Sequence, residues 1–80
     1  MKRYIKSNFE HTYSFDVVVW KTPHNNTADL YETFNTFSDA LNYAYRNSDY
    51  YRCDIYKMPD NVRICQYSYG QEVPRSRYIH

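Results

Sequence analysis

The sequence predicts an α+β fold in which one antiparallel β-sheet of about four strands carries a single helix on one face. Three observations support this class: short segments rich in alternating, β-branched or aromatic residues, one segment with helical spacing, and polar turn-forming links between them. The elements follow one another as strand, strand, helix, strand, strand. Such an order favours one layer of sheet packed against one layer of helix.

The first two strands are expected on either side of a polar loop. Residues 13–21, YSFDVVVWK, are dense in β-branched and aromatic side chains, and the loop TPHNNTAD at 22–29 contains a proline and two asparagines. Residues 30–34, LYETF, alternate again and predict a strand that pairs antiparallel with the first. A helical start at 30–34 is the alternative.

The helix is predicted within residues 36–48, TFSDALNYAYRNS. Thr36 stands three residues before Asp39, a spacing typical of a helix N-terminus. The apolar residues that follow recur at helical intervals and form one stripe, which predicts about three turns of amphipathic helix: Phe37, Ala40, Leu41, Ala44 and Tyr45.

A second hairpin is predicted from YYRCDIYK at 50–57 and VRICQYSY at 62–69, joined by MPDN. With Pro59 and Asp60 at the turn centre, Ile55 lies opposite Ile64. Cys53 then faces Gln66, so Cys53 and Cys65 lie on opposite faces as unlinked thiols. A three-residue turn would place Cys53 across from Cys65, but it would also turn Arg63 toward the helix, where a charge needs a partner.

Side-chain alternation divides the predicted sheet into two faces. The face toward the helix is expected to hold the aliphatic residues, namely Phe15, Val17, Val19, Leu30, Phe34, Tyr51, Cys53, Ile55, Val62 and Ile64. The face away from the helix is expected to hold Asp16, Val18, Trp20, Tyr31, Arg52, Asp54, Tyr56, Arg63, Cys65, Tyr67 and Tyr69.

The whole chain is expected to form one domain. Its 80 residues divide into an N-terminal segment or short strand at 1–12, the ββαββ core at 13–70, and an extended basic tail at 71–80. The basic start lacks the apolar stretch that a secretory signal needs, and no run approaches membrane-spanning length. We therefore expect a cytoplasmic protein that does not enter a membrane.

Composition and spacing argue against catalysis, a cofactor or a metal. His11, His24 and His80 are scattered, and none has a carboxylate or cysteine at metal-ligand spacing. Asp16 and Asp54 could form a carboxylate pair if their strands were neighbours, but solvated pairing with Arg52 or Arg63 across the sheet is favoured. We expect no catalytic residues, no cofactor, no metal and no enzyme activity.

The face away from the helix has the composition of a protein interface, because Trp, Tyr and Arg dominate binding energy at such surfaces. The predicted partner-binding residues are Trp20, Tyr31, Arg52, Tyr56, Arg63, Tyr67 and Tyr69.

Three alternatives remain open for this face. The chain termini could cover it, with Tyr4, Ile5, Val73 and Ile79 forming a second small core, or it could mediate a homodimer. It could also bind single-stranded nucleic acid by base stacking. The isoelectric point of about 7.8 and the two aspartates argue against nucleic acid.

The profile as a whole resembles the small accessory proteins of phages that infect low-GC bacteria, including anti-CRISPR proteins and inhibitors of host enzymes. The resemblance rests on the short ββαββ-like domain, the Asn and Tyr bias, the lack of a catalytic constellation and the aromatic face. It implies stoichiometric binding that occludes a host enzyme or a CRISPR-Cas nuclease complex. Trp20, Tyr56, Tyr67 and Tyr69 would then anchor the partner, with Arg52 and Arg63 beside them. The runner-up function is a small nucleic-acid-binding or transcription-modulating protein.

Overall fold

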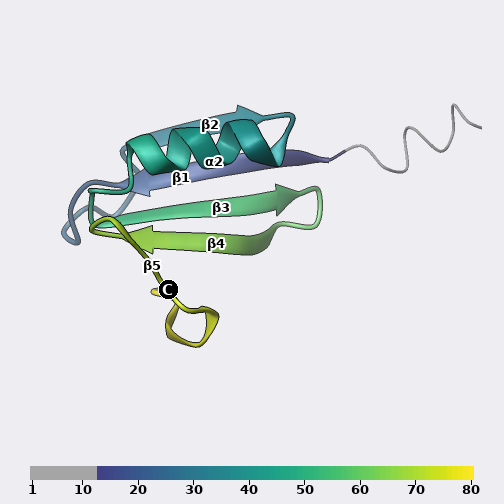
Figure 1. Ribbon diagram of the computed structural model, residues 1–80. Helices are drawn as coiled ribbons and strands as arrows, with labels where there is room; N and C mark the ends of the chain where they lie inside the picture. Colours follow the sequence, from purple (N-terminus) through teal and green to yellow (C-terminus); the bar gives the residue numbers. More distant parts are fainter. Residues whose placement is uncertain (1–12) are drawn as a thin grey trace, which may run out of the picture.

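The fold is a five-stranded antiparallel sheet with one helix packed on one face, which confirms the α+β class (Figure 1). The computed structural model describes residues 13–80, so the segment predicted at 1–12, with Tyr4 and Ile5, lies outside the described residues. The strand order is β2-β1-β3-β4-β5. Within residues 13–80, none of the helical structure has the length and apolar character needed to cross a membrane.

The first hairpin forms as predicted. Strand β1 (Ser14–Trp20) pairs antiparallel with β2 (Leu30–Phe34), with Val17 opposite Glu32. The Asp29 carboxylate closes the loop by accepting hydrogen bonds from the backbone N–H of Lys21 at 2.7 Å and from the Asn25 amide. These bonds favour the charged form and lower the pKa of Asp29.

Helix α2 (Phe37–Arg46) begins where the Thr36–Asp39 spacing predicts it. The Thr36 hydroxyl accepts a hydrogen bond from the Asp39 N–H at 3.2 Å and so satisfies one of the free donors at the helix start. Ala40 and Ala44 are fully buried against the sheet, and Leu41 packs beside them. Two small residues at the contact let the helix approach the strands closely.

The core lies between α2 and the centre of the sheet. Strand β3 (Arg52–Met58) pairs with β1 over its whole length, which places Val17 next to Ile55 and Val19 next to Cys53. All four of these side chains are fully buried. Phe15, Leu30 and Phe34 pack around them, as the predicted alternation requires.

The second hairpin departs from prediction at a β-bulge. Strand β4 (Val62–Ser68) follows the predicted register as far as Tyr56 opposite Arg63, and the register then shifts by one residue. Ile64 is the extra residue, so Ile55 faces Cys65 and Cys53 faces Tyr67. Because a one-residue shift exchanges the faces of a strand, every residue of β4 after Ile64 points to the side opposite to the predicted one.

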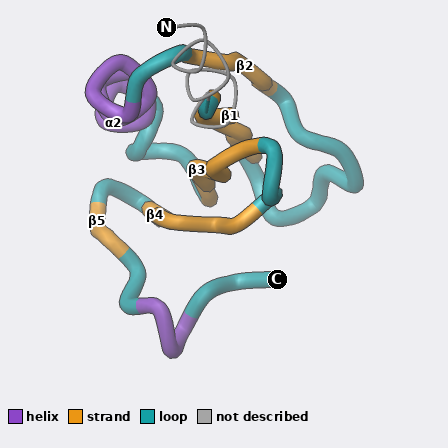
Figure 2. Tube along the Cα trace, turned by 90° about the vertical axis from the view of Figure 1, so that its right-hand side faces the viewer, coloured by secondary structure: helices purple, strands orange, loops and turns teal. Residues whose placement is uncertain are grey.

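The segment predicted as an extended tail is partly structured. Gln71–Glu72 form a short strand, β5, on the outer side of β4, and Arg75–Arg77 form one 3₁₀ turn, η1. Figure 2 shows that the chain then bends beneath β4 and ends on the side of the sheet opposite to α2. The tail thus returns to the face that the helix leaves uncovered.

We expect Ile55→Ala to destabilise the protein by about 2–5 kcal/mol, because Ile55 is the largest fully buried aliphatic side chain of the core. Urea unfolding followed by circular dichroism measures this cost. Val62→Ala is the matched control: Val62 is 49% exposed, so its loss should cost under about 1 kcal/mol. Equal costs for the two variants would contradict the described core.

Candidate interaction surface

The face away from the helix carries five of the seven predicted partner-binding residues. Trp20 on β1, Tyr31 on β2, Arg52 and Tyr56 on β3, and Arg63 on β4 all share this face with Asp16 and Asp54. Here it is called the polar face. Most of these side chains, however, form hydrogen bonds, ion pairs or stacking contacts with one another.

Asp54 is the centre of the polar face. Its side chain has no solvent exposure, although it is charged and lies on a sheet that bears only one helix. Oδ1 accepts a hydrogen bond from Gln66 Nε2 at 2.7 Å, and Oδ2 is 2.9 Å from the guanidinium of Arg52 and 3.8 Å from that of Arg63. A buried carboxylate needs such partners, because desolvation of an unpaired charge is costly.

The two arginines are themselves stacked on aromatic rings. The Arg52 guanidinium lies 4.2 Å from the centroid of the Trp20 ring, its cross-strand neighbour. The Arg63 guanidinium lies between two rings, 5.6 Å from Tyr56 and 5.3 Å from Tyr78 of the tail. These contacts hold the cations over Asp54 and cover it from water.

The C-terminal tail closes the β4 side of the polar face. The backbone of Ile79 forms two hydrogen bonds with the Gln66 side chain: its N–H donates at 2.7 Å, and its carbonyl accepts from Nε2 at 3.0 Å. Arg63 also donates to the Ile79 carbonyl at 2.9 Å. The expectation of an uncovered aromatic face is therefore wrong here, and the alternative of closure by a terminus describes the β4 side.

Tyr67 does not lie on the predicted face. The bulge at Ile64 turns its ring toward α2, where it is 6% exposed and meets the ring of Tyr45 at a centroid distance of 5.6 Å. This burial raises the pKa of its phenol. Tyr67 is a core residue, and its prediction as a surface anchor at that face is corrected.

The bulge also corrects the placement of the cysteines. Cys53 and Cys65 lie on the same face, toward the helix, and both are free thiols. Burial raises the pKa of Cys53 to about 12 and also raises that of Cys65. Neither thiol ionises at neutral pH, so neither is an activated nucleophile.

Asp16 forms a second, separate site on the polar face. It is 7% exposed, and its two oxygens accept hydrogen bonds from the hydroxyls of Tyr31 and Thr33, the latter at 2.9 Å. The hydrogen bond to Asp16 raises the pKa of Tyr31. Beside Asp16 lies a shallow pocket of about 500 Å³, whose other lining residues are Tyr13, Ser14, Thr33, Asn35, Met58 and Pro59.

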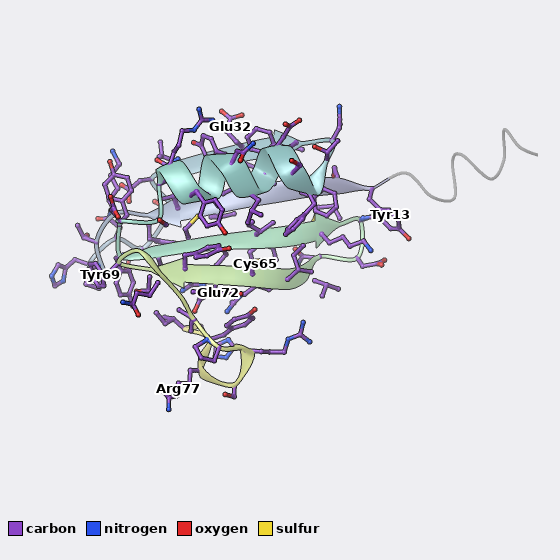
Figure 3. All side chains as sticks on the ribbon, viewed as in Figure 1. Tyr13, Glu32, Cys65, Tyr69, Glu72 and Arg77 are labelled. Carbon is purple, nitrogen blue, oxygen red and sulfur yellow. The ribbon has the colours of Figure 1, made fainter. Side chains whose placement is uncertain are left out.

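Tyr69 lies past the end of β4 and is 63% exposed. Its backbone has a φ of 50°, the left-handed region that a bulky residue rarely occupies. Two backbone hydrogen bonds impose this geometry: Tyr69 N–H donates to the Tyr50 carbonyl at 2.9 Å, and Gly70 N–H donates to Ser48 at 2.6 Å. Figure 3 shows Tyr69 at the end of the sheet opposite to Tyr13.

Three further residues join Tyr69 in a surface that we call the tyrosine end, defined by Lys21, Tyr50, Tyr51 and Tyr69. The rings of Tyr51 and Tyr69 meet edge to face at 6.0 Å, and the Lys21 ammonium lies 5.2 Å from the Tyr50 ring. Tyr51 N–H donates to the Lys21 carbonyl and ties β3 to the end of β1. Tyr50 and Tyr69 are both exposed.

Sequence reasoning missed Lys21, Tyr50 and Gln66 as members of these sites. A signal for Gln66 was present, because the neighbouring apolar residues Ile64 and Cys65 break the alternation of β4 and mark a bulge. The Tyr50–Tyr51 pair before a strand gave no comparable signal, since its position depends on the left-handed turn at Tyr69.

The acidic and metal-ligating side chains of the described residues are dispersed. Within residues 13–80, no three His, Cys, Asp or Glu side chains are grouped so that they could hold a metal ion. Asp16 and Asp54 lie on neighbouring strands, and Asp54 is paired with Arg52 on its own strand and with Arg63 on β4. This pairing is buried, whereas the sequence favoured a solvated pair across the sheet. Comparison of the chain with protein-family models, curated proteins and solved structures finds no match.

We expect Gln66→Ala to release the C-terminal tail, because the Gln66 side chain forms two of the three hydrogen bonds that hold the Ile79 backbone, including the one from the Ile79 N–H. Hydrogen exchange followed by NMR should show protection of the Ile79 amide in the natural protein and its loss in the variant. Stability should fall by about 1–3 kcal/mol, since Asp54 also loses a buried donor.

Ser68→Ala is the control for the tail. Ser68 lies on the same strand, and its hydroxyl donates to the Tyr51 carbonyl at 2.6 Å and not to the tail. Its replacement should leave Ile79 protected. An Ile79 amide that exchanges at the unprotected rate in the natural protein would contradict the docked tail.

We expect Asp16→Asn to lower the pKa of Tyr31 toward its usual value of 10.0, because the hydrogen bond to Asp16 is the largest cause of the raised value. Since the folded pKa exceeds the unfolded one, the stabilisation is present below about pH 10 and is lost as the pH rises through the folded pKa. NMR titration of the Tyr31 ring carbons measures the shift. An unchanged pKa in the variant would contradict the Tyr31–Asp16 bond.

Proposed function

We propose that this protein is a small non-catalytic binding module that acts stoichiometrically on a protein partner, with the tyrosine end as its contact surface. The observation that carries the proposal is the strained, exposed position of Tyr69. A bulky residue in the left-handed region costs about 1–2 kcal/mol relative to glycine. Residues with such backbone strain cluster at functional sites, where the surrounding structure holds them in place.

The composition of the tyrosine end supports a protein partner. Tyrosine buries a large rigid area at low entropic cost while keeping a hydroxyl for hydrogen bonds, and it is enriched among interface hot spots. Tyr50, Tyr51 and Tyr69 are fixed to one another through backbone hydrogen bonds and ring contacts. A surface that is already ordered loses less conformational entropy on binding.

The proposed surface therefore differs from the one expected from sequence. Of the seven predicted residues, Tyr69 remains a central anchor, and Trp20 and Arg52 lie at the same end of the sheet, where β1 ends and β3 begins. Arg63 is bound to the tail and to Tyr56, and Tyr67 belongs to the core.

The resemblance noted in the sequence implies one form of this function. In that form, a phage-type protein inhibits a host enzyme or a CRISPR-Cas complex. Occlusion requires only a rigid contact surface, which is what the tyrosine end offers. The proposal includes a cytoplasmic location, in keeping with two thiols that are not joined in a disulfide.

The test begins with the protein used as bait in a lysate of its source cells and identification of the protein that co-purifies. The dissociation constant is then measured with the purified partner by calorimetry. Tyr69→Asn should weaken binding by about thirtyfold or more, as expected for loss of a central tyrosine. Asparagine tolerates the left-handed region, so folding stability should change by less than about 1 kcal/mol.

Val62→Ser is the matched control, because Val62 is an exposed apolar residue at the opposite end of the sheet. It should leave the dissociation constant unchanged. If Tyr69→Asn binds as tightly as the natural protein, the tyrosine end is not the contact surface.

Salt dependence distinguishes the runner-up, binding to nucleic acid. A complex built on tyrosine burial should change its dissociation constant by less than about tenfold between 50 and 500 mM NaCl, whereas one built on phosphate contacts weakens by about a thousandfold or more. Concentration-dependent sedimentation of the protein alone, abolished by Tyr69→Asn, would instead assign this surface to a homodimer.

A further inference from the structure

The two buried carboxylates of the polar face have different partners. Asp54 is paired with two guanidinium groups, whereas the ion pairs formed within residues 13–80 do not include Asp16. Asp16 is 7% exposed and is hydrogen-bonded by the two neutral hydroxyls of Tyr31 and Thr33. A carboxylate that is nearly buried gains strongly from a cation, because neutral donors offset only part of its lost hydration.

Space for such a cation lies directly beside Asp16. The pocket of about 500 Å³ that Asp16 helps to line is otherwise bordered by neutral residues, including Ser14, Thr33 and Asn35. Their hydroxyl and amide oxygens can accept further hydrogen bonds from an N–H group. Tyr13 and Met58, also in the lining, offer apolar contact for an alkyl chain.

We propose that this pocket binds an alkylammonium or alkylguanidinium group, as carried by lysine and arginine side chains, with Asp16 as its counter-ion. The geometry that carries the inference is the nearly buried carboxylate beside an open pocket with neutral walls. Each carboxylate oxygen has two acceptor sites, so Asp16 can accept from the ligand while it keeps its bonds to Tyr31 and Thr33. The site lies at the other end of the sheet from Tyr69 and is independent of the function proposed above.

The same chemistry could be supplied from two sources. One is a lysine or arginine of another protein. The other is this chain itself, since the sequence places Lys2, Arg3 and Lys6 before Tyr13. Both sources predict the same dependence on Asp16, and the experiment separates them.

The probes are n-butylammonium and n-butylguanidinium chloride, with 1-butanol as the uncharged comparison, added to the full-length protein. The readout is the amide chemical shifts of Ser14, Thr33 and Asn35 in heteronuclear NMR. We expect saturable shifts with a dissociation constant of about 1–10 mM for the cations, as such small ligands allow, and no saturation with 1-butanol.

Two variants test the role of the carboxylate and of the pocket. Asp16→Asn keeps the size of the side chain and should weaken cation binding by at least about tenfold. Ser14→Leu should block the pocket without altering the carboxylate. Glu32→Gln is the control, because Glu32 is an exposed carboxylate that points to the opposite face of the adjacent strand, and it should bind as the natural protein does.

The source is identified with a full-length variant in which Lys2, Arg3 and Lys6 are all changed to Gln. If the natural protein binds the probes, the site is open to a cation from another molecule. If only the triple variant binds them, the chain's own segment occupies the site, and the cation pocket is equally supported. The proposal is overturned if neither protein binds the cations saturably, or if Asp16→Asn binds them as tightly as the natural protein. An unchanged amide spectrum away from the pocket confirms that each variant is folded.

Discussion

The burial of the Asp54 carboxylate is the constraint on which the arrangement of the polar face depends. A sheet with one helix has one face open to water, yet Asp54 is fully buried on that face. Its charge needs cations, which fixes Arg52 and Arg63, and the remaining acceptor position is taken by Gln66. Gln66 in turn accepts a hydrogen bond from the Ile79 N–H. The tail therefore docks on the same side chain that donates to the Asp54 carboxylate. Removing one of these partners would leave the buried carboxylate with fewer donors, and such a loss is more costly than never having buried the group.

The bulge at Ile64 makes this arrangement compatible with the core. In an unbroken register, Arg63 on the polar face would bring Cys65 and Tyr67 to the same face, and Gln66 would point into the core beneath the helix. One extra residue lets β4 place Arg63 and Gln66 on the polar side, and Ile64, Cys65 and Tyr67 on the helix side. The register predicted from the sequence holds between the turn and the bulge. Beyond the bulge Cys53 faces Tyr67, a pairing that neither register considered from the sequence contains, and this shift brings both cysteines to one face.

Much of the fold could be predicted because local patterns determine it. The Thr36 cap, the apolar stripe of α2 and the alternation of β1 follow from short-range physics, and the first hairpin is a short-range pairing. The candidate sites were harder to predict, since their geometry depends on long-range partners. Nothing near Ile79 in the sequence indicates Gln66, and the left-handed turn at Tyr69 results from carbonyls of Ser48 and Tyr50. Composition identified the aromatic and arginine residues correctly, but it could not show which of them are already bound internally.

What separates a structural from a functional residue on such a surface is whether its interactions are complete. Arg52, Arg63 and Tyr56 have aromatic or carboxylate partners within the protein, and truncating them would damage the fold before it affected any partner. Tyr69 keeps a strained backbone and an exposed ring, and Asp16 keeps a nearly buried carboxylate beside an open pocket. The exposed Tyr69 ring has area that a partner can bury, and the Asp16 carboxylate has acceptor positions that a cation can use. We therefore propose these two positions, at opposite ends of the sheet, as the ones where a ligand has most to contribute.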